Sequence, residues 1–353
     1  MDTDVISATR AYEAWLASQT RVVRADLQRK HELMRGSPFV FLRATFYRWM
    51  QQWTALGRTV TEAPRVIAVG DLHIENFGTW RDAEGRLIWG VNDVDEACEL
   101  PYTQDLVRLA ASAALAARAQ HFALSERTAC DAILDGYTTC STHGGRPIVL
   151  GERHTWLRRL AVNRLRDPVR FWRNLQKSPR LRGEAPHQAL RSTLPRGTDD
   201  YRVHRRVAGV GSLGRQRFVA IAAWEGGLVA REAKAWVPSA AAWAGVSSRS
   251  DAAEMLLAGS IRAVDPCFSL RKPWIVQRLA PDCSRIELAD LPKERDEEKL
   301  LRAMGWETAN MHGGSRRAIL RDLAGRRARW LLRAAGDMAD ATVDDWRRWK
   351  RLG

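Results

Sequence analysis

An aspartate and an asparagine stand five positions apart in the segment Gly-Asp-Leu-His-Ile-Glu-Asn, which covers residues 70–76. The carboxylate of Asp71 can orient or deprotonate a hydroxyl that attacks a phosphoryl group, and the side-chain oxygen of Asn76 can bind magnesium. The pair therefore has the chemistry that phosphoryl transfer requires. Any loop can contain such a pair, so the spacing alone is weak evidence.

An acidic cluster, Asn-Asp-Val-Asp-Glu at residues 92–96, directly follows the apolar strand candidate 87–91. The turn pattern Asp-Ala-Glu-Gly at residues 82–85 predicts a hairpin that returns this cluster to the loop. Nucleotide phosphates need a cation, so we expect Asp93 to bind magnesium, and Asp95 to be a ligand of a second metal or a supporting carboxylate. A solvated acidic turn is the alternative, but the adjoining apolar strand favours a position near the core.

These motifs, Gly-Asp-Leu-His-x-x-Asn and Asn-Asp-x-Asp, followed by Pro101 and Asp105-Leu106, resemble the aminoglycoside-phosphotransferase branch of the protein-kinase-like superfamily. They are more closely similar to a bacterial family catalogued as a domain of unknown function. The resemblance covers residues 30–315 in segments.

The resemblance implies a role for each of these residues. Asp71 would be the catalytic base, Asn76 and Asp93 would bind Mg²⁺, and Asp105 would brace the catalytic loop from the start of the next helix. A carboxylate in a first helical turn also interacts favourably with the helix dipole. His73 stands where many such kinases have a loop histidine. It is a catalytic candidate, but packing or hydrogen bonding within the loop is the simpler interpretation.

A glycine-rich segment, Gly-Val-Gly-Ser-Leu-Gly, covers residues 209–214 between two strand candidates. Glycines allow backbone amides to approach phosphate closely, which makes Gly209, Gly211, Ser212 and Gly214 candidates for nucleotide binding. A dinucleotide-binding version of the motif requires a helix directly after it, whereas residues 217–222 have the pattern of a strand. The segment therefore favours a kinase-like phosphate loop.

Three further residues are candidates for the nucleotide site. Lys234 ends the strand candidate 228–234 and is expected to contact the α- and β-phosphates. Glu254, in the helix candidate 250–264, is the expected partner of Lys234. Gln277 belongs to the strand candidate 274–279, which would enter the hinge whose backbone binds adenine.

The order of these segments places the catalytic loop before the nucleotide lobe, the reverse of the order in a kinase. We therefore expect an α+β, bilobal, protein-kinase-like fold that is circularly permuted, with a small antiparallel β-rich lobe and a larger helical lobe. The expected divisions are an N-terminal helical segment (1–64), the catalytic loop and helices of the large lobe (65–200), the β-rich lobe (201–282) and returning helices (283–353). Residues 141–200 are expected to be irregular, with one or two helices.

The periodicity of apolar residues predicts the elements that position these residues. Helices are expected over residues 1–57, 104–120, 125–137, 250–264, 294–312 and 316–339. Strands are expected over residues 65–69, 87–91, 201–207, 217–223, 228–236 and 274–279.

The composition fits a cytoplasmic protein of 353 residues. No apolar run approaches the roughly 18–20 residues that span a bilayer. The first 17 residues contain three acidic side chains and no continuous apolar stretch, which argues against a secretory signal. The five cysteines lack C-x-x-C spacing and are expected to be free thiols, with no zinc site.

The net charge of +15 leaves alternatives open. It is compatible with a nucleic-acid surface, but a polyanionic nucleotide also needs positive potential. Two hypotheses compete with phosphoryl transfer. One is nucleotidyl (AMP) transfer on the same fold, and the other is a degenerate kinase fold that binds nucleic acid or an acidic partner. Arg43 is a minor candidate for a phosphate or an acidic substrate. The hydroxyl-bearing acceptor, the choice between ATP and GTP, and the oligomeric state are not specified by the sequence.

Overall fold

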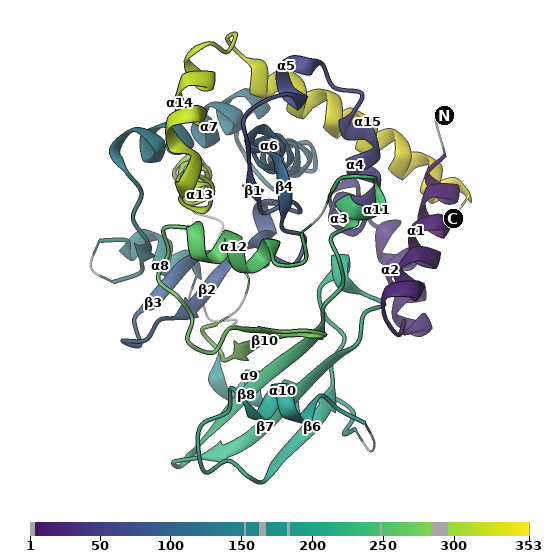
Figure 1. Ribbon diagram of the computed structural model, residues 1–353, viewed down its shortest axis with the longest axis vertical. Helices are drawn as coiled ribbons and strands as arrows, with labels where there is room; N and C mark the ends of the chain where they lie inside the picture. Colours follow the sequence, from purple (N-terminus) through teal and green to yellow (C-terminus); the bar gives the residue numbers. More distant parts are fainter. Residues whose placement is uncertain are drawn as a thin grey trace.

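The computed structural model describes residues 4–151, 153–161, 167–181, 184–247, 249–283, 285 and 296–352. The fold is α+β, about half helical, with several antiparallel sheets. Helices gather around α6 (Tyr102–Arg118), and a five-stranded sheet extends from one end of this helical part (Figure 1). Within the described residues, no helix is long and apolar enough to cross a membrane.

Helix α6 is the centre of the helical part, since nearly all of its residues are buried. Three further helices, α7 (Glu126–His143), α13 (Glu297–Met311) and α15 (Trp330–Leu352), pack in the same part. A Cβ at Gly136 of α7 would clash with Arg302 O of α13, and one at Gly305 would clash with Ile133 O. The two glycines therefore permit the close crossing of α7 and α13.

Helices also precede the catalytic-loop segment, as the sequence predicts. They are α1 (Val5–Gln19), α2 (Arg24–Met34), α3 (Pro38–Ala44), α4 (Phe46–Trp53) and α5 (Arg58–Thr61). Asp4 caps α1 through the amides of Ile6 and Ser7, and Ser37 caps α3 ahead of Pro38. Such side chains satisfy amides that a helix start leaves unpaired.

Two small sheets surround the loop of residues 69–76. Strand β1 (Arg65–Ala68) pairs with β4 (Cys98–Pro101), and β2 (Phe77–Arg81) pairs with β3 (Leu87–Val91), which in turn pairs with β5 (Ile148–Val149). The 82–85 turn joins β2 to β3 as a hairpin. The sequence predicts β1 and β3 but not the short strands β2, β4 and β5.

The five-stranded antiparallel sheet has the order β6-β7-β8-β10-β9. Its strands are β6 (Tyr201–Arg205), β7 (Arg217–Trp224), β8 (Gly227–Ala235), β9 (Ser269–Arg271) and β10 (Trp274–Leu279). All except β9 were expected from the sequence.

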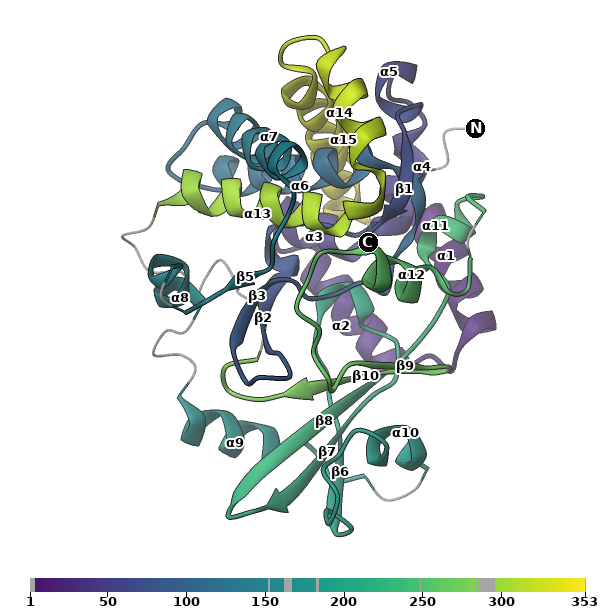
Figure 2. The same ribbon diagram turned by 60° about the vertical axis from the view of Figure 1, so that its left-hand side comes forward.

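Two short helices cover opposite faces of this sheet, α9 (Pro168–Gln176) and α10 (His187–Arg191) (Figure 2). Leu190 of α10 packs with Phe218, whereas Leu175 of α9 packs with Val219, the next residue of β7. Adjacent residues of a strand face opposite sides of a sheet. The expected boundary at residue 201 is therefore too late, because the helices that cover the sheet begin at Pro168.

Segment 240–259 leaves the sheet and returns to the helical part. Helix α11 (Ala240–Trp243) packs on α4, and α12 (Ala252–Gly259) packs on β1, β4 and α13. Helix α12 is shorter than the predicted 250–264. At the C-terminal end the predicted helix 316–339 is two helices, α14 (Arg316–Ala324) and α15, and α8 (Thr155–Ala161) lies in the segment expected to be irregular.

Candidate functional site

Side chains of helix α6 accept hydrogen bonds from backbone amides of the catalytic-loop segment. Asp105 accepts hydrogen bonds from Val69 N at 2.7 Å and Gly70 N at 2.9 Å, and Ser112 Oγ accepts one from Ile74 N at 3.1 Å. Asp105 and Ser112 lie on one helical face because they are seven residues apart. Asp105 and Ser112 therefore attach the loop to α6.

The carboxylate of Asp71 is fixed from the same face of α6. Arg108 Nε donates to Asp71 Oδ1 at 2.8 Å, and its guanidinium lies over the rings of Phe46 and Trp49 at 4.9 and 4.8 Å. The Arg108 side chain is fully buried, while 18% of the Asp71 side chain is exposed. Arg108 therefore occupies one oxygen of Asp71, and the other oxygen lies toward Gly211 of the glycine loop.

Asn76 links the two acidic segments. Its Nδ2 donates to Asp71 O at 3.0 Å and to Asp93 O at 3.1 Å, and its Oδ1 accepts from Asp93 N at 2.9 Å. Asn76 therefore acts as a brace in this structure. A carbonyl oxygen has two lone pairs, so one remains for a second donor or a cation.

His73 is buried within the loop. Its Nδ1 accepts a hydrogen bond from Glu75 N at 3.2 Å, and its ring packs edge-on against Phe39. Burial, and then Arg43, lower the pKa of His73 well below its usual value, so the imidazole is neutral near pH 7. These contacts are those of a residue that shapes the loop, the simpler of the two interpretations of His73.

Lys234 joins the sheet to the acidic cluster, although some 140 positions separate them in the chain. Its Nζ lies 3.0 Å from Asp93 Oδ1 and 2.7 Å from Asp95 Oδ1. Burial lowers the pKa of Lys234 to about 8, because removal from water outweighs the attraction of Asp93. Burial acts to raise the pKa of Asp93, but Lys234 and Arg285 outweigh it and hold that pKa well below its usual value.

The predicted pairing of Lys234 with Glu254 is wrong. Glu254 is exposed on α12, which packs on β1 and β4 instead of beside β8. The buried acid on this sheet is Glu232, which accepts from Arg217 at 2.7 Å and from Gln277 at 2.8 Å. Gln277 therefore faces the site with its side chain, while its backbone pairs with β8.

The glycine loop connects β6 to β7 and reaches the catalytic loop. Gly209 and Gly214 have positive φ angles of 74° and 99°, a conformation that glycine adopts readily. A Cβ at Gly211 would lie 2.9 Å from Arg43 O, so only glycine fits that close approach. Ser212 Oγ accepts from Arg217 at 2.6 Å. Gly214 packs on Leu27 and its carbonyl accepts from Val23 N, so it faces α2 instead of the site.

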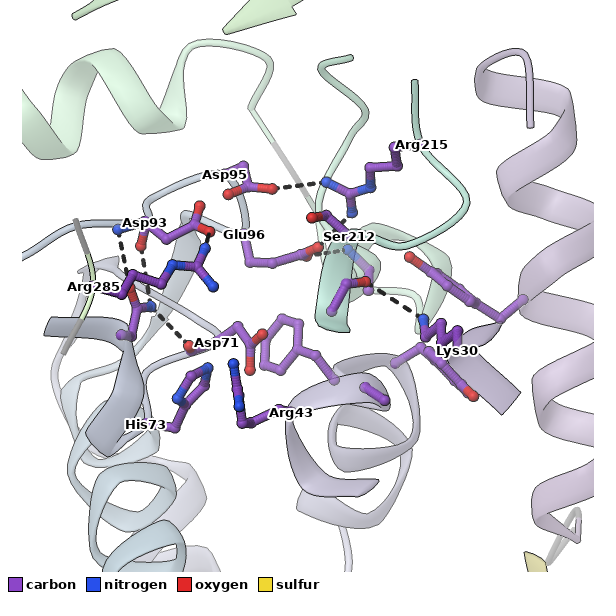
Figure 3. Close-up of a pocket in the computed structure, with 17 residues that line it drawn as sticks. Lys30, Arg43, Asp71, His73, Asp93, Asp95, Glu96, Ser212, Arg215 and Arg285 are labelled. Carbon is purple, nitrogen blue, oxygen red and sulfur yellow. Dashed lines mark hydrogen bonds and ion pairs between the residues drawn. The ribbon is translucent and has the colours of Figure 1, made fainter. Parts of the chain in front are cut away.

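Two cavities share lining residues here, and Figure 3 shows the residues that line the smaller one. The smaller, of about 40 Å³, is bounded by the catalytic loop, the acidic cluster, the glycine loop and helices α1 to α4. The larger, of about 560 Å³, opens between the five-stranded sheet and the β2–β3 hairpin, and Arg285 and Arg43 line both. Its volume is in the range of small-molecule sites. Arginines line the larger cavity: Arg43, Arg206, Arg217, Arg262, Arg278 and Arg285.

Several site residues were not identified from the sequence. Arg108 had a signal, since it lies three residues after Asp105 on the same face of α6. Arg215 directly follows the glycine loop and contacts Asp95 and Glu96, each at 2.8 Å. Arg285 binds Asp93 from the segment after β10, and no motif precedes it.

The side chains around Asp93 offer oxygen atoms that could bind the expected magnesium ion. Within the described ranges, no three His, Cys, Asp or Glu side chains surround one metal position. Asp93 and Asp95 nevertheless converge on a single cationic atom, Lys234 Nζ. Mg²⁺ in nucleotide sites is commonly held by one or two carboxylates plus substrate phosphates and water. The residues that could hold a nucleotide-bound Mg²⁺ are therefore Asp93 and Asp95, together with the remaining lone pair of Asn76 Oδ1.

A buried acid behind the acidic cluster gives a pH-dependent prediction. Glu307 of α13 accepts from Val91 N at 3.3 Å and Asn310 Nδ2 at 2.8 Å, and burial raises its pKa to about 7. The folded protein then binds more protons than the unfolded chain between the usual pKa of about 4.5 and pH 7. The free energy of unfolding should therefore fall as pH rises through this window, by roughly 3 kcal/mol in all.

Glu307→Gln should remove most of this decline, which urea unfolding at pH 5, 6 and 7 would measure. An equal decline in wild type and variant would show that Glu307 ionises normally.

Residues 21–147 match the model of a protein family described as "Uncharacterized protein conserved in bacteria (DUF2252)". This confirms the resemblance to an uncharacterised bacterial family over α2 to α7, a shorter stretch than expected, and leaves the glycine loop and Lys234 outside the matched residues. The match shows no relation to kinases. No curated protein and no solved structure matches the chain.

Proposed function

We propose that the protein is an ATP- and Mg²⁺-dependent phosphotransferase that acts on a hydroxyl group, with a circularly permuted, bilobal, kinase-like arrangement. The main support is the contact of Lys234 Nζ with Asp93 and Asp95. Kinase chemistry requires a phosphate-binding lysine beside the metal-binding aspartate. The segment that contains Asp93 and Asp95 and the strand that contains Lys234 are thus adjacent in space, although they occur in this chain in the reverse of the order found in kinases.

The larger cavity is the proposed nucleotide site. Gly209 and Val210 line one side, and Leu279, Pro281 and Cys283 line the end where β10 leaves the sheet. The base would lie at that end, against the backbone of the segment after β10. The phosphates would extend toward the glycine loop, where Arg217 and Arg285 supply positive charge.

Asp71 is the proposed acceptor-orienting group. Arg108 holds Oδ1, which leaves Oδ2 to accept the hydrogen of the attacking hydroxyl. Bound Mg²⁺ would neutralise charge on the transferring phosphoryl group. Asn76 keeps the Asp71 and Asp93 segments at a fixed separation through its two backbone contacts. Rigid positioning of this kind supplies much of the catalysis in phosphoryl transfer.

We propose a cytoplasmic location, where the five buried cysteines would remain thiols.

Lys234→Ala should abolish or strongly reduce the increase in melting temperature that Mg-ATP produces in the wild type. The variant loses the ammonium that faces the phosphates and leaves Asp93 and Asp95 with less positive charge nearby. Arg202→Ala is the matched control, because Arg202 is an exposed cation on the same sheet.

Equal Mg-ATP shifts in both variants would contradict the assignment of Lys234. The absence of any shift in the wild type would contradict the proposed function. Mass spectrometry of a modified acceptor distinguishes a gain of phosphate from the gain of AMP that nucleotidyl transfer would give.

A further inference from the structure

The helices before the catalytic loop form the far wall of the small cavity at Asp71. Tyr12 of α1, Lys30 of α2 and Tyr47 of α4 line it opposite the acidic cluster, and Lys30 points toward the glycine loop in Figure 3. Because the larger cavity is the proposed nucleotide site, this wall is where an acceptor would contact the protein.

Lys30 differs from the other cations of the cavity. It is only 3% exposed, and the contacts found for it are one long hydrogen bond to Gly211 O, at 3.4 Å, and the ring faces of Tyr12 and Tyr47 at 5.9 and 5.8 Å. Among the described residues, Lys30 forms no ion pair, whereas every other cation of the cavity faces a carboxylate: Arg43 with Glu75, Arg215 with Asp95 and Glu96, and Arg285 with Asp93.

An ammonium group has three donors, and burying it without acceptors is unfavourable. The single long bond to Gly211 O leaves most of this donor capacity unused. Tyr12 and Tyr47 are stacked, with ring centroids 4.2 Å apart, and their faces cannot replace a carboxylate. The arrangement fits a site whose anion comes from a ligand.

We propose that Lys30 binds the carboxylate of the acceptor, and that the acceptor is a small hydroxy acid whose hydroxyl group faces Asp71. This inference rests on the proposed phosphotransferase function and specifies its substrate class.

Gly211 lies close to both groups that would contact this acceptor. Its carbonyl accepts a hydrogen bond from Lys30, and a Cβ at this position would lie 3.6 Å from Asp71 Oδ2, so both groups are close to the same residue. The free volume of about 40 Å³ holds about three water molecules. An acceptor of a few heavy atoms, with its hydroxyl and carboxylate close together, fits this space.

The reaction is balanced without a further reactant. The acceptor oxygen forms a bond to the γ-phosphorus of ATP while the bond from that phosphorus to the bridging oxygen of ADP breaks. ADP leaves with the bonding electron pair, and the hydroxyl proton passes to Asp71 Oδ2 and then to solvent. The product is the phosphate ester of the hydroxy acid.

The charge of Lys30 gives the site a pH dependence. Burial lowers the pKa of Lys30 to about 8. The groups that face it are Tyr12, Glu13, Tyr47, Asp71, Glu96 and Arg215. The ammonium binds a carboxylate only when protonated, so KM for the acceptor should rise about tenfold per pH unit above pH 8.

The test measures transfer of labelled phosphate from Mg-ATP by the full chain to paired acceptors. The pairs are glycolate with ethylene glycol, lactate with 1,2-propanediol, and glycerate with glycerol. The wild type should favour at least one acid over its neutral partner by roughly 10–100-fold in kcat/KM, the range of a charge-assisted hydrogen bond. Lys30→Met should lose this preference, retain the Mg-ATP thermal shift and melt no lower than the wild type. Lys30→Arg should keep the preference above pH 8.

Three results would overturn the inference. One is transfer to neutral partners at the same rate as to acids. Another is a preference for acids that survives in Lys30→Met. The third is a normal Mg-ATP shift with no transfer to any acid, which would leave the proposed function in place with a different acceptor. The absence of a Mg-ATP thermal shift in the wild type would reject both this inference and the proposed function.

Discussion

Replacing Asp71 with asparagine should slow phosphoryl transfer by about 10²–10⁴-fold while Mg-ATP binding persists. The amide cannot accept the hydroxyl proton, but it preserves the volume of the side chain. Arg108, which holds Asp71 Oδ1, keeps its hydrogen bond of 2.9 Å to Leu42 O and its aromatic neighbours. Steady-state kinetics with labelled ATP and a thermal shift with Mg-ATP measure the two effects separately.

Asp345→Asn is the matched control for this substitution. Asp345 is also a buried aspartate held by an arginine, with Arg48 Nε 2.6 Å from its Oδ2, but it lies on α15 outside both cavities. Asp345→Asn should lower the free energy of unfolding and leave kcat unchanged. If Asp71→Asn retained full activity, or if both variants lost activity equally, Asp71 would not be the acceptor-orienting group.

The proximity of residues that belong to neighbouring short motifs was predictable from the sequence. The 70–76 and 92–96 segments lie next to local elements, a strand and a hairpin, so that their approach follows from the chain itself. The contact between Lys234 and Asp93 required one further premise, that the glycine-loop sheet closes on the catalytic loop. The distance of 3.0 Å agrees with that premise.

The wrong assignments share a physical origin. Glu254 was chosen because a helix follows β8, but α12 buries Ala252, Ala253 and Leu256 against the helical part, and this leaves Glu254 exposed. The side chains of α9 and α10 were likewise assigned to the large lobe, although Leu175 and Leu190 bury against the sheet. Apolar periodicity shows that a face is buried but not against which partner.

Lys30 and Arg285 show a second limit of the sequence. Neither residue was assigned to the site from the sequence, and the role proposed for each depends on its neighbours in space. The excess of positive charge has a partial explanation here. Six of the arginines line the larger cavity, where they would favour the proposed polyanionic nucleotide.

Asp105→Asn should destabilise the protein by about 3 kcal/mol, because it disrupts a buried and charged hydrogen-bond network. The carboxylate accepts from Val69 N, Gly70 N and His312 Nε2, the last at 3.0 Å, and His312 Nδ1 lies 2.8 Å from the hydroxyl of Tyr137. An asparagine directs an amide N–H toward one of these donors and leaves it without an acceptor. Chemical denaturation should show the loss, and hydrogen exchange should be faster at the amides of residues 69 and 70.

Glu254→Gln is the control that distinguishes the loss of this hydrogen-bond network from the loss of a negative charge at the start of a helix. Both acids lie in the first turn of a helix, Asp105 in α6 and Glu254 in α12, and both favour the helix dipole. Glu254 is exposed, so its neutralisation should cost at most about 1 kcal/mol and leave the exchange of residues 69 and 70 unchanged. Equal losses in the two variants would mean that Asp105 acts through the dipole alone. A loss confined to Asp105→Asn, with slower phosphoryl transfer and an unchanged Mg-ATP shift, would show that the brace positions Asp71.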